Sequence, residues 1–184
     1  REILKPLIEW GPPVAVDLKP MPYPVIQSML DEGFPAGFHV YWRGDFIQQL
    51  TDDVIDTLVE QFGNVTTPHS PLLVEQLGGA SRRVAVEDSA FVHRNADYNV
   101  AIVSRWDGED GSSPDSHVAW ARDVHDAIRP YASGVYVNYV GYGEDDDRIR
   151  QAYGPETYER LARLKAKYDP ENVFNSNQNI KPAL

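Results

Sequence analysis

The stretch from Ser133 to Pro182 constrains the fold of this chain more than any other, because three kinds of structure follow one another in it. Its first part, SGVYVNYV, alternates as a half-buried strand does. One face of this predicted strand carries Val135, Val137 and Tyr139, and the other carries Tyr136, Asn138 and Val140. One strand would therefore present two tyrosines and an amide.

A helix is predicted next, within GPETYERLARLKAKYDP. Gly154-Pro155 suits its start, since proline is tolerated at the first helical position, and Asp169-Pro170 ends it. Its apolar side chains recur at helical spacing: Tyr158, Leu161, Leu164 and Tyr168. The tail that follows is rich in side-chain amides, which suit hydrogen bonding to backbone or to a polar ring system. These amides are Asn175, Asn177, Gln178 and Asn179.

The rest of the chain alternates predicted strands with predicted helices. Strands are expected over residues 14–18, 37–46, 72–77 and 98–106, and helices over 51–63 and 113–129. Several strands are half polar, whereas parallel strands are usually buried on both faces and uniformly apolar. We therefore predict an α+β fold, in which helices cover one face of an antiparallel sheet.

Composition limits the partners that this chain can have. Its 184 residues carry a formal net charge of -11, which disfavours nucleic acid, since binding to phosphates needs concentrated Lys and Arg. No apolar run approaches the roughly 20 residues that span a bilayer, so no membrane partner is expected. The chain has no cysteine, and therefore neither a disulfide nor a thiol ligand. A small molecule or another protein is the expected partner.

The five histidines do not form a metal-binding pattern, because none is paired with another histidine or a carboxylate at metal-ligand spacing. We expect His117 and His125, two turns apart on a predicted helix, to lie on a solvated face. His93 and Arg94 together suggest catalysis. Such a pair at the entrance of a strand more often anchors the structure through hydrogen bonds and ion pairs, and we favour that interpretation.

Four motifs follow one another in the last third of the chain. They are Tyr136-x-Asn-Tyr139, Tyr142-Gly143, Lys165-x-Lys-Tyr-Asp-Pro-x-Asn-x-Phe174 and Asn177-Gln-Asn-Ile-x-Pro182. In this order they resemble the C-terminal signature of the berberine bridge enzyme-like FAD-linked oxidase family. Upstream, the Gly-Gly-Ala at residues 78–80 and the Ala-Phe-x-His-Arg at residues 90–94 resemble the same family.

The resemblance implies two parts, a substrate-binding α+β domain over residues 1–140 and a C-terminal segment over residues 141–184 that returns to a separate FAD domain. The family's FAD domain, with its glycine-rich pyrophosphate loop and its His and Cys attachments to flavin, is not found in this sequence. The resemblance therefore implies FAD as the cofactor and an FAD-binding domain, upstream or in another chain, as a partner. The isolated chain is expected to be inactive.

The resemblance also implies roles for single side chains. Oxidation of an alcohol by flavin needs a base beside the substrate hydroxyl, and Tyr139 is the first candidate, with Tyr136 in reserve. A tyrosine, whose ordinary pKa is near 10, would serve only if positive charge or hydrogen bonds stabilised its phenolate. Alternatively, both tyrosines simply pack in the sheet. Asn138, Asn177 and Gln178 are the expected contacts to the flavin.

Three more residues are candidates for substrate binding. Asn99 stands in the strand where relatives present polar side chains to the substrate, although Ala101 on the same face is apolar. Tyr41 and Arg43 share one face of the strand at 37–46. That face forms either ordinary packing or a wall of the substrate site, since aromatic faces stack on sugars and on aromatic substrates alike.

We therefore expect the C-terminal part of an FAD-dependent oxidoreductase. It would oxidise an alcohol, sugar or natural product by hydride transfer to flavin, with dioxygen reoxidising the flavin. The alternatives are a catalytically inactive, freestanding ligand-binding module and a subunit that partners a separate FAD protein.

Overall fold

The computed structural model describes residues 2–11, 13–109, 111–141 and 146–183. The chain divides into two compact units, residues 1–37 and residues 38–184, and each is described by itself. Within the described residues, none of the helices combines the length and the apolar character that crossing a bilayer requires.

The first unit consists of short helices joined by irregular chain. It contains the 3-10 helix η1 (Glu2–Leu4), α1 (Lys5–Glu9), α2 (Tyr23–Gln27) and the 3-10 helix η2 (Asp31–Gly33). The strand predicted over residues 14–18 is wrong, because this segment is irregular and both Val14 and Val16 are exposed. Alternation of apolar residues makes a strand only where a neighbouring strand satisfies the backbone hydrogen bonds.

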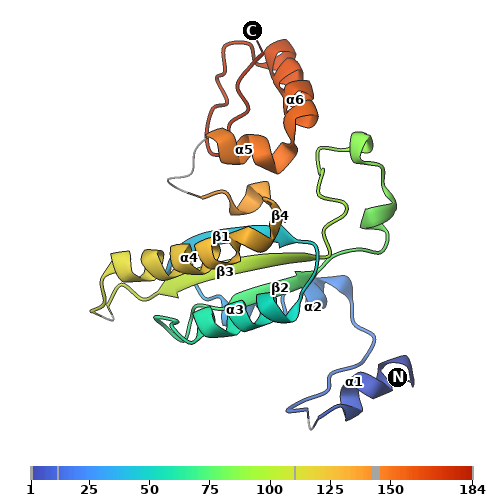
Figure 1. Cartoon of the computed structure of the whole chain (residues 1–184), viewed down its shortest axis with the longest axis vertical. Helices are drawn as coiled ribbons and strands as arrows, with labels where there is room; N and C mark the ends of the chain where they lie inside the picture. The colour runs from blue at the N-terminus through green and yellow to red at the C-terminus, as the bar shows by residue number, and fades with distance from the viewer. Residues whose placement is uncertain (1, 12, 110, 142–145, 184) are drawn as a thin grey trace. The chain divides into compact units, whose positions relative to one another are not determined.

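A four-stranded antiparallel sheet forms the centre of the second unit (Figure 1). Its strands are β1 (His39–Ile47), β2 (Leu72–Gln76), β3 (Tyr98–Trp106) and β4 (Ala132–Gly134), in the order β2-β3-β1-β4. β1 and β3 pair along their whole lengths, from His39 opposite Trp106 to Ile47 opposite Tyr98. The predicted α+β class and the antiparallel sheet are therefore confirmed.

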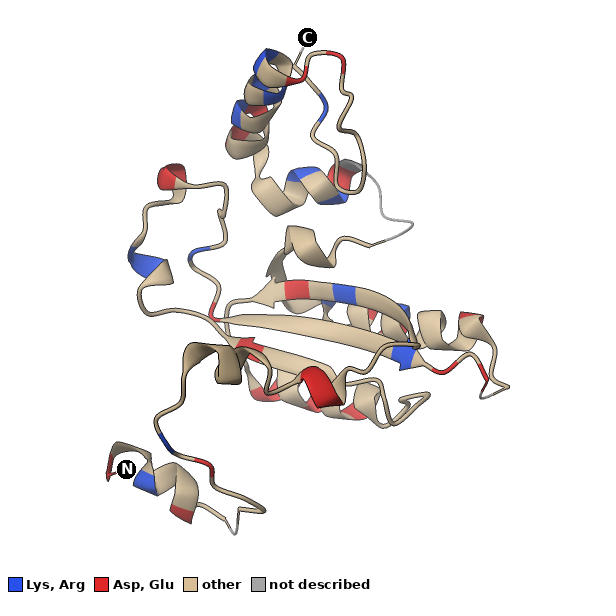
Figure 2. Ribbon diagram, turned by 180° about the vertical axis from the view of Figure 1, so that it is seen from behind, with Lys and Arg blue, Asp and Glu red and all other residues tan. Residues whose placement is uncertain are grey.

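Two helices, α3 (Asp52–Phe62) and α4 (Pro114–Ile128), lie on the same face of the sheet, as Figure 1 and the view from behind in Figure 2 show. Thr51 caps α3 by accepting a hydrogen bond from the Val54 amide. The helices and this sheet face enclose the main core: Ile47, Val54, Leu58, Val100, Ile102, Trp120, Ala121, Val124 and Ile128. Burial of each large apolar side chain here contributes about 1.5–3 kcal/mol.

The segment predicted as a long tyrosine-bearing strand is mostly a turn. Only Ala132–Gly134 pairs with β1, as β4, and the register shifts there between Phe46 and Ile47. The chain then turns through the 3-10 helix η6 (Val137–Tyr139), in which the Tyr139 amide donates to the Tyr136 carbonyl at 2.9 Å. The predicted alternation is therefore wrong beyond Gly134, and Tyr136 and Tyr139 do not lie on opposite faces of a strand.

The C-terminal segment contains α5 (Asp146–Tyr153) and α6 (Pro155–Tyr168), so the predicted start at Gly154-Pro155 is confirmed. Gly154 joins the two helices with a φ of 69°, a conformation that favours glycine. A second core lies here, made up of Val135, Val140, Ile149, Ala152, Tyr158 and Ala162. The Tyr142-Gly143 motif lies outside the described residues.

Asp169 stabilises the turn that follows α6. Its carboxylate accepts hydrogen bonds from the amides of Val173 at 2.8 Å and Phe174 at 3.1 Å, and it also pairs with the ammonium group of Lys165. Lys165 donates a further hydrogen bond to the Phe174 carbonyl at 2.6 Å. The Lys-x-Lys-Tyr-Asp-Pro motif thus has a structural explanation, because it fixes the start of the amide-rich tail.

Candidate functional site

The candidate site lies on the sheet face opposite α3 and α4, which we call the site face. Its β1 residues Trp42, Gly44 and Phe46 pair with Val103, Ala101 and Asn99 of β3, and paired residues of antiparallel strands point to the same side. The ring of Tyr139 lies directly over Gly44, where a Cβ atom would come 2.7 Å from Cδ2 of Tyr139. This ring also stacks on Trp42, with centroids 5.6 Å apart and planes at 6°.

A carboxylate on the site face connects Tyr139 with Asn99. Glu75 of β2 stands opposite Asn99 of β3, and its Oε2 accepts hydrogen bonds from Nδ2 of Asn99 at 2.5 Å and from Oη of Tyr139 at 3.4 Å. Asn99 is buried, and its own Oδ1 has no hydrogen-bond partner among the described residues. A buried carbonyl oxygen without a partner is costly, so it is suited to accept a hydrogen bond from a ligand.

The environment of Tyr139 keeps its phenol protonated. Burial raises the pKa of Tyr139, and the neighbouring Glu75 carboxylate raises it further. Of the interactions that could stabilise a phenolate, only the hydrogen bond with Asn99 lowers the pKa of Tyr139, and burial and Glu75 outweigh it. At neutral pH Tyr139 is a hydrogen-bond donor to Glu75, with lone pairs left on its oxygen for another donor.

Tyr136 lies beside Tyr139 on this face. Their rings meet edge to face with centroids 5.3 Å apart, and the Tyr136 hydroxyl accepts a hydrogen bond from Nδ2 of Asn138 at 2.9 Å. Phe46 and Phe91 complete an aromatic wall around Tyr136 at 5.7 and 6.3 Å. Two predicted catalytic candidates and one predicted flavin contact are thus neighbours in the structure.

Two hollows adjoin these side chains. One of about 230 Å³ is lined by residues that include Glu75, Phe91, Arg94, Asn99 and Tyr136. The other, of about 350 Å³, is lined by residues that include Trp42, Asn138 and Tyr139. Aromatic walls with a few polar groups are typical of small-molecule sites.

Of the other two predicted substrate residues, Tyr41 borders the hollow of Asn138 and Tyr139, whereas Arg43 does not line it. Tyr41 packs against the main core on the helix-covered face, where Nε of Arg43 donates to its hydroxyl at 2.9 Å and Nε of Arg122 does so at 3.4 Å. The strand pleat separates this face from Asn99 and Tyr139. Of the two interpretations of the Tyr41 face, the structure favours ordinary packing.

The prediction of solvated histidines on α4 is wrong, since His117 and His125 are both buried. His117 stacks on Trp106 at 4.9 Å, and its Nδ1 lies 2.7 Å from the Thr66 hydroxyl. His125 lies 3.0 Å from the Asp45 carboxylate. A helical pattern indicates only which residues are polar. It cannot show that a buried histidine has hydrogen-bond or ion-pair partners inside the core.

His93 and Arg94 act as anchors, as the sequence suggested. His93 lies 3.0 Å from the Ala152 carbonyl of α5, and burial lowers the pKa of its imidazole. Arg94 donates to the Ser81 carbonyl at 2.8 Å and to the Ser89 hydroxyl at 2.6 Å. Among the described residues no group of three or more His, Cys, Asp or Glu side chains could hold a metal ion.

Comparison with known proteins assigns this chain to a family. A family profile described as "Berberine and berberine like" matches residues 135–181. An FAD-linked oxidoreductase of Dictyostelium discoideum is 35% identical over 184 residues, which are 97% of this chain and 39% of the relative. The chain belongs to the berberine bridge enzyme-like FAD-linked oxidoreductase family.

Further proteins are similar to this berberine bridge enzyme-like chain, one in sequence and two in fold. An uncharacterized FAD-linked oxidoreductase of Bacillus subtilis is 30% identical over 98% of this chain and 41% of its own length. The chain therefore spans about two fifths of the curated relatives it matches. Berberine bridge enzyme of Eschscholzia californica superposes with a TM-score of 0.68 at 22% identity, over 79% of this chain and 33% of that one. A carbohydrate oxidase of Microdochium nivale does so with a TM-score of 0.64 at 21% identity, over the same shares.

The C-terminal tail of the berberine bridge enzyme-like signature is hydrogen-bonded to the chain next to Tyr139. Nε2 of Gln178 donates to the Val140 carbonyl at 2.6 Å, directly after Tyr139. Asn177 is exposed and has a φ of 56°. Neither lines the hollow that contains Asn138 and Tyr139, among the residues the structure describes. Of the three predicted flavin contacts, the structure places Asn138 beside Tyr139 and ties Gln178 to the same segment.

The sequence analysis missed Glu75. A signal was present, because residues 72–77 were predicted as a strand and Glu75 within it could face the same side as Asn99. Only the register of β2 against β3 brings the Glu75 carboxylate under the Tyr139 hydroxyl.

Proposed function

We propose that this chain is the C-terminal, substrate-binding part of an FAD-dependent oxidoreductase that oxidises an alcohol, a sugar or a related natural product, with dioxygen as the final acceptor. The observation that carries the proposal is the Tyr139–Glu75–Asn99 hydrogen-bonded group on the site face of a berberine bridge enzyme-like fold. Residues 1–140 then form the substrate domain, and residues 141–184 form the segment that meets an FAD domain upstream or in another chain.

Tyr139 and Glu75 together provide a route for the substrate proton. A substrate hydroxyl that donates to Oη of Tyr139 can pass its proton to that oxygen while the phenolic proton moves to Glu75. This relay needs no free phenolate, in agreement with the raised pKa of Tyr139. FAD, when bound, supplies the acceptor for the hydride that leaves the same carbon, so the alcohol becomes a carbonyl.

The remaining site residues orient the substrate. The buried Oδ1 of Asn99 accepts a hydrogen bond from a second substrate hydroxyl, and Tyr136, Phe46 and Phe91 form a wall for the face of a ring. The amide of Asn138 is exposed beside Tyr139, and amides match the alternating donors and acceptors of a flavin edge. We assign Asn138 to the flavin, with Asn177 and Gln178 on the adjoining tail as further contacts.

Reduction of bound flavin by substrate tests this proposal in the protein expressed from its complete reading frame. Flavin absorbance should be present, and Tyr139→Phe and Glu75→Gln should each slow flavin reduction by about 10²-fold or more while substrate binding changes little. Tyr131→Phe is the matched control, because Tyr131 is exposed and lines neither of the two site hollows, and it should leave the rate unchanged. A colourless protein, or equal losses in all three variants, would overturn the proposal.

A further inference from the structure

The chain between β2 and β3, residues 77–97, forms most of the wall of the smaller hollow on the site face. We call these residues the wall segment, which is green in Figure 1. The hollow has a volume of about 230 Å³ and contains Glu75 and Asn99. The wall segment supplies more of its described lining residues than the rest of the chain does: Leu77, Ser81, Phe91, His93, Arg94 and Ala96. The conformation of this segment therefore decides what the hollow admits.

Arg82 connects the two ends of the wall segment. It lies in the 3-10 helix η3 (Ser81–Arg83). Its Nη2 donates to the Ala96 carbonyl at 3.0 Å and pairs with the Asp97 carboxylate. Its Nε donates to the Arg94 carbonyl at 3.3 Å. One guanidinium group therefore holds residues 94–97 against the start of the segment, since its donors reach several acceptors at once.

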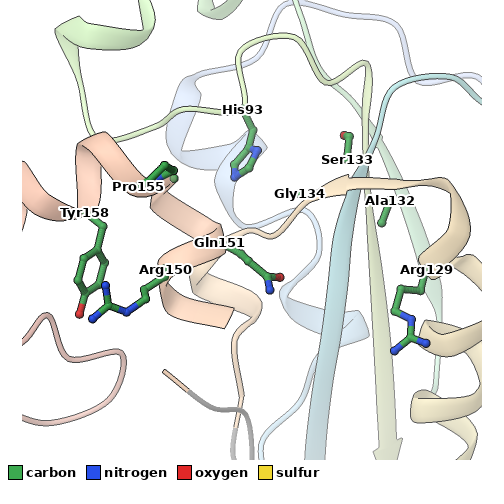
Figure 3. Close-up of a pocket in the computed structure, with 10 residues that line it drawn as sticks. His93, Arg129, Ala132, Ser133, Gly134, Arg150, Gln151, Pro155 and Tyr158 are labelled. Carbon is green, nitrogen blue, oxygen red and sulfur yellow. The ribbon is translucent and has the colours of Figure 1, made fainter. Parts of the chain in front are cut away.

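The far side of the wall segment contacts the C-terminal helices. Nη1 of Arg160 of α6 donates to the Glu87 carbonyl at 2.7 Å. Nε2 of His93 lies 3.0 Å from the Ala152 carbonyl of α5, and Figure 3 shows the His93 side chain projecting from the segment toward Gly134. The wall segment is therefore held at both sides.

Phe91 is the aromatic ring that the wall segment adds to the hollow. Its ring meets Phe46 and Tyr136 edge to face, with centroids 5.7 and 6.3 Å away. Cζ of Arg94 lies 5.0 Å from its centroid. Phe91 is therefore in contact on three sides, and it cannot move aside for a larger ligand without losing some of these contacts.

The volume of the hollow limits the size of a ligand. A cavity of about 150 Å³ holds one benzene molecule. The hollow, at about 230 Å³, therefore has room for one six-membered ring with a short substituent, but not for a second ring of the same size.

We propose, on the basis of the oxidation proposed above, that the substrate carries its reacting alcohol on a single six-membered ring. Phe91 sets this limit, and Arg82 is a positioning residue that holds the segment carrying Phe91. The alcohol end of the ring meets Glu75, which lines the hollow and accepts the hydrogen bond of Tyr139. Neither Phe91 nor Arg82 takes part in proton or hydride transfer.

Binding of benzyl alcohol and of 4-phenylbenzyl alcohol to the 184-residue chain tests the size limit without flavin. Calorimetry gives the affinities, and the NMR signals of the Asn99 side-chain amide report on the hollow. Benzyl alcohol should bind about tenfold or more tightly than 4-phenylbenzyl alcohol, because the second ring overfills the hollow. Without such a limit the order would be reversed, since a second ring buries more apolar surface.

Phe91→Ala should remove the limit. The variant should bind 4-phenylbenzyl alcohol about tenfold or more tightly than the wild-type chain does, because the shortened side chain leaves room for the second ring. Phe91→Leu keeps an apolar side chain and should shift the preference in the same direction, so it serves where Phe91→Ala does not fold. Phe174→Ala is the control, because Phe174 is exposed and does not line the hollow, and it should change neither affinity.

Arg82→Gln should loosen the wall segment. Hydrogen exchange should accelerate at the Phe91 and Ala96 amides, which donate to the Ser89 hydroxyl and the His93 carbonyl, and the preference for benzyl alcohol should fall. Exchange of the Ile102 amide in β3 should stay unchanged, which separates loosening of the segment from unfolding of the sheet. Arg83→Gln is the matched control in the same 3-10 helix and should change neither quantity.

Tighter binding of 4-phenylbenzyl alcohol than of benzyl alcohol by the wild-type chain, or no binding of benzyl alcohol, would overturn the size limit. An unchanged preference in the Phe91 variants would overturn the role of Phe91. Equal effects of Arg82→Gln and Arg83→Gln would overturn the role of Arg82. Because these measurements need no flavin, a complete protein whose flavin is not reduced by substrate would overturn the proposed function and leave these results unaffected.

Discussion

Arg148 of α5 donates a hydrogen bond from Nη2 to Oδ1 of Asp45 of β1 at 3.1 Å, at a position where Asp45 is almost completely buried. His125 of α4 lies 3.0 Å from the other oxygen of the same carboxylate. This group therefore connects the sheet, its covering helix and the family signature segment.

Arg148→Gln should lower the free energy of unfolding by about 3 kcal/mol, because it leaves the Asp45 carboxylate buried with an incomplete partner set. Urea unfolding measures this change. Arg163→Gln is the control, since its pair with Glu159 at 3.8 Å is exposed and should contribute less than about 1 kcal/mol. Similar decreases in the free energy of unfolding for the two variants would show that the buried Asp45–Arg148 pair contributes no more than an exposed pair.

Gly44→Ala should displace the Tyr139 ring. The added methyl would lie 2.7 Å from Cδ2 of Tyr139 and 2.8 Å from the Val100 carbonyl oxygen, and overpacking of this kind costs about 1–3 kcal/mol. Urea unfolding gives the cost, and the near-ultraviolet circular dichroism of the Trp42–Tyr139 stack should change. Gly33→Ala is the control, because no atom lies within 4 Å of the added methyl, and it should change neither the free energy of unfolding nor the spectrum. An unchanged spectrum for Gly44→Ala would contradict the packing of the Tyr139 ring over Gly44.

Glu75→Gln should lower the pKa of Tyr139, because it removes the negative charge that helps to raise it. Burial, the largest cause, remains, so the pKa stays above that of an exposed tyrosine. NMR titration of the tyrosine Cζ carbons measures this, with Tyr139→Phe to assign the signal. In the wild-type chain the neutral phenol is favoured by folding. The resulting stabilisation is complete below about pH 10 and is lost as the pH rises through the folded pKa. An unchanged pKa of Tyr139 in the Glu75→Gln variant would show that the Glu75 carboxylate does not interact with the Tyr139 phenol.

Asp169→Asn should loosen the tail. The pKa of Asp169 is lowered, first by the hydrogen bond from Lys165 and also by those from the Val173 and Phe174 amides. Folding therefore favours the carboxylate, and its stabilisation is present above the ordinary aspartate pKa and lost as the pH falls through the folded value. Hydrogen exchange at the Val173 and Phe174 amides should accelerate in the variant and in wild type at low pH. Asp126→Asn on α4 is the control, and unchanged protection in Asp169→Asn would exclude this role.

The sequence by itself determined the α+β class, the strands β1, β2 and β3, the helices α3, α4 and α6, and the family. These follow from periodicity, capping residues and ordered motifs, all of which are properties of neighbouring residues. The same local pattern at residues 14–18 and 135–140 gave strands that do not form, because a strand also needs a partner with free backbone groups.

Only the tertiary structure decided how the site is assembled. It separated Tyr41 and Arg43 from Asn99, buried His117 and His125, and placed Glu75 under Tyr139. It also raised the pKa of Tyr139, through burial and the neighbouring Glu75 carboxylate. The physical reason is that strand register, desolvation and charge proximity arise between residues far apart in the chain, where spacing along the sequence carries no information about distance.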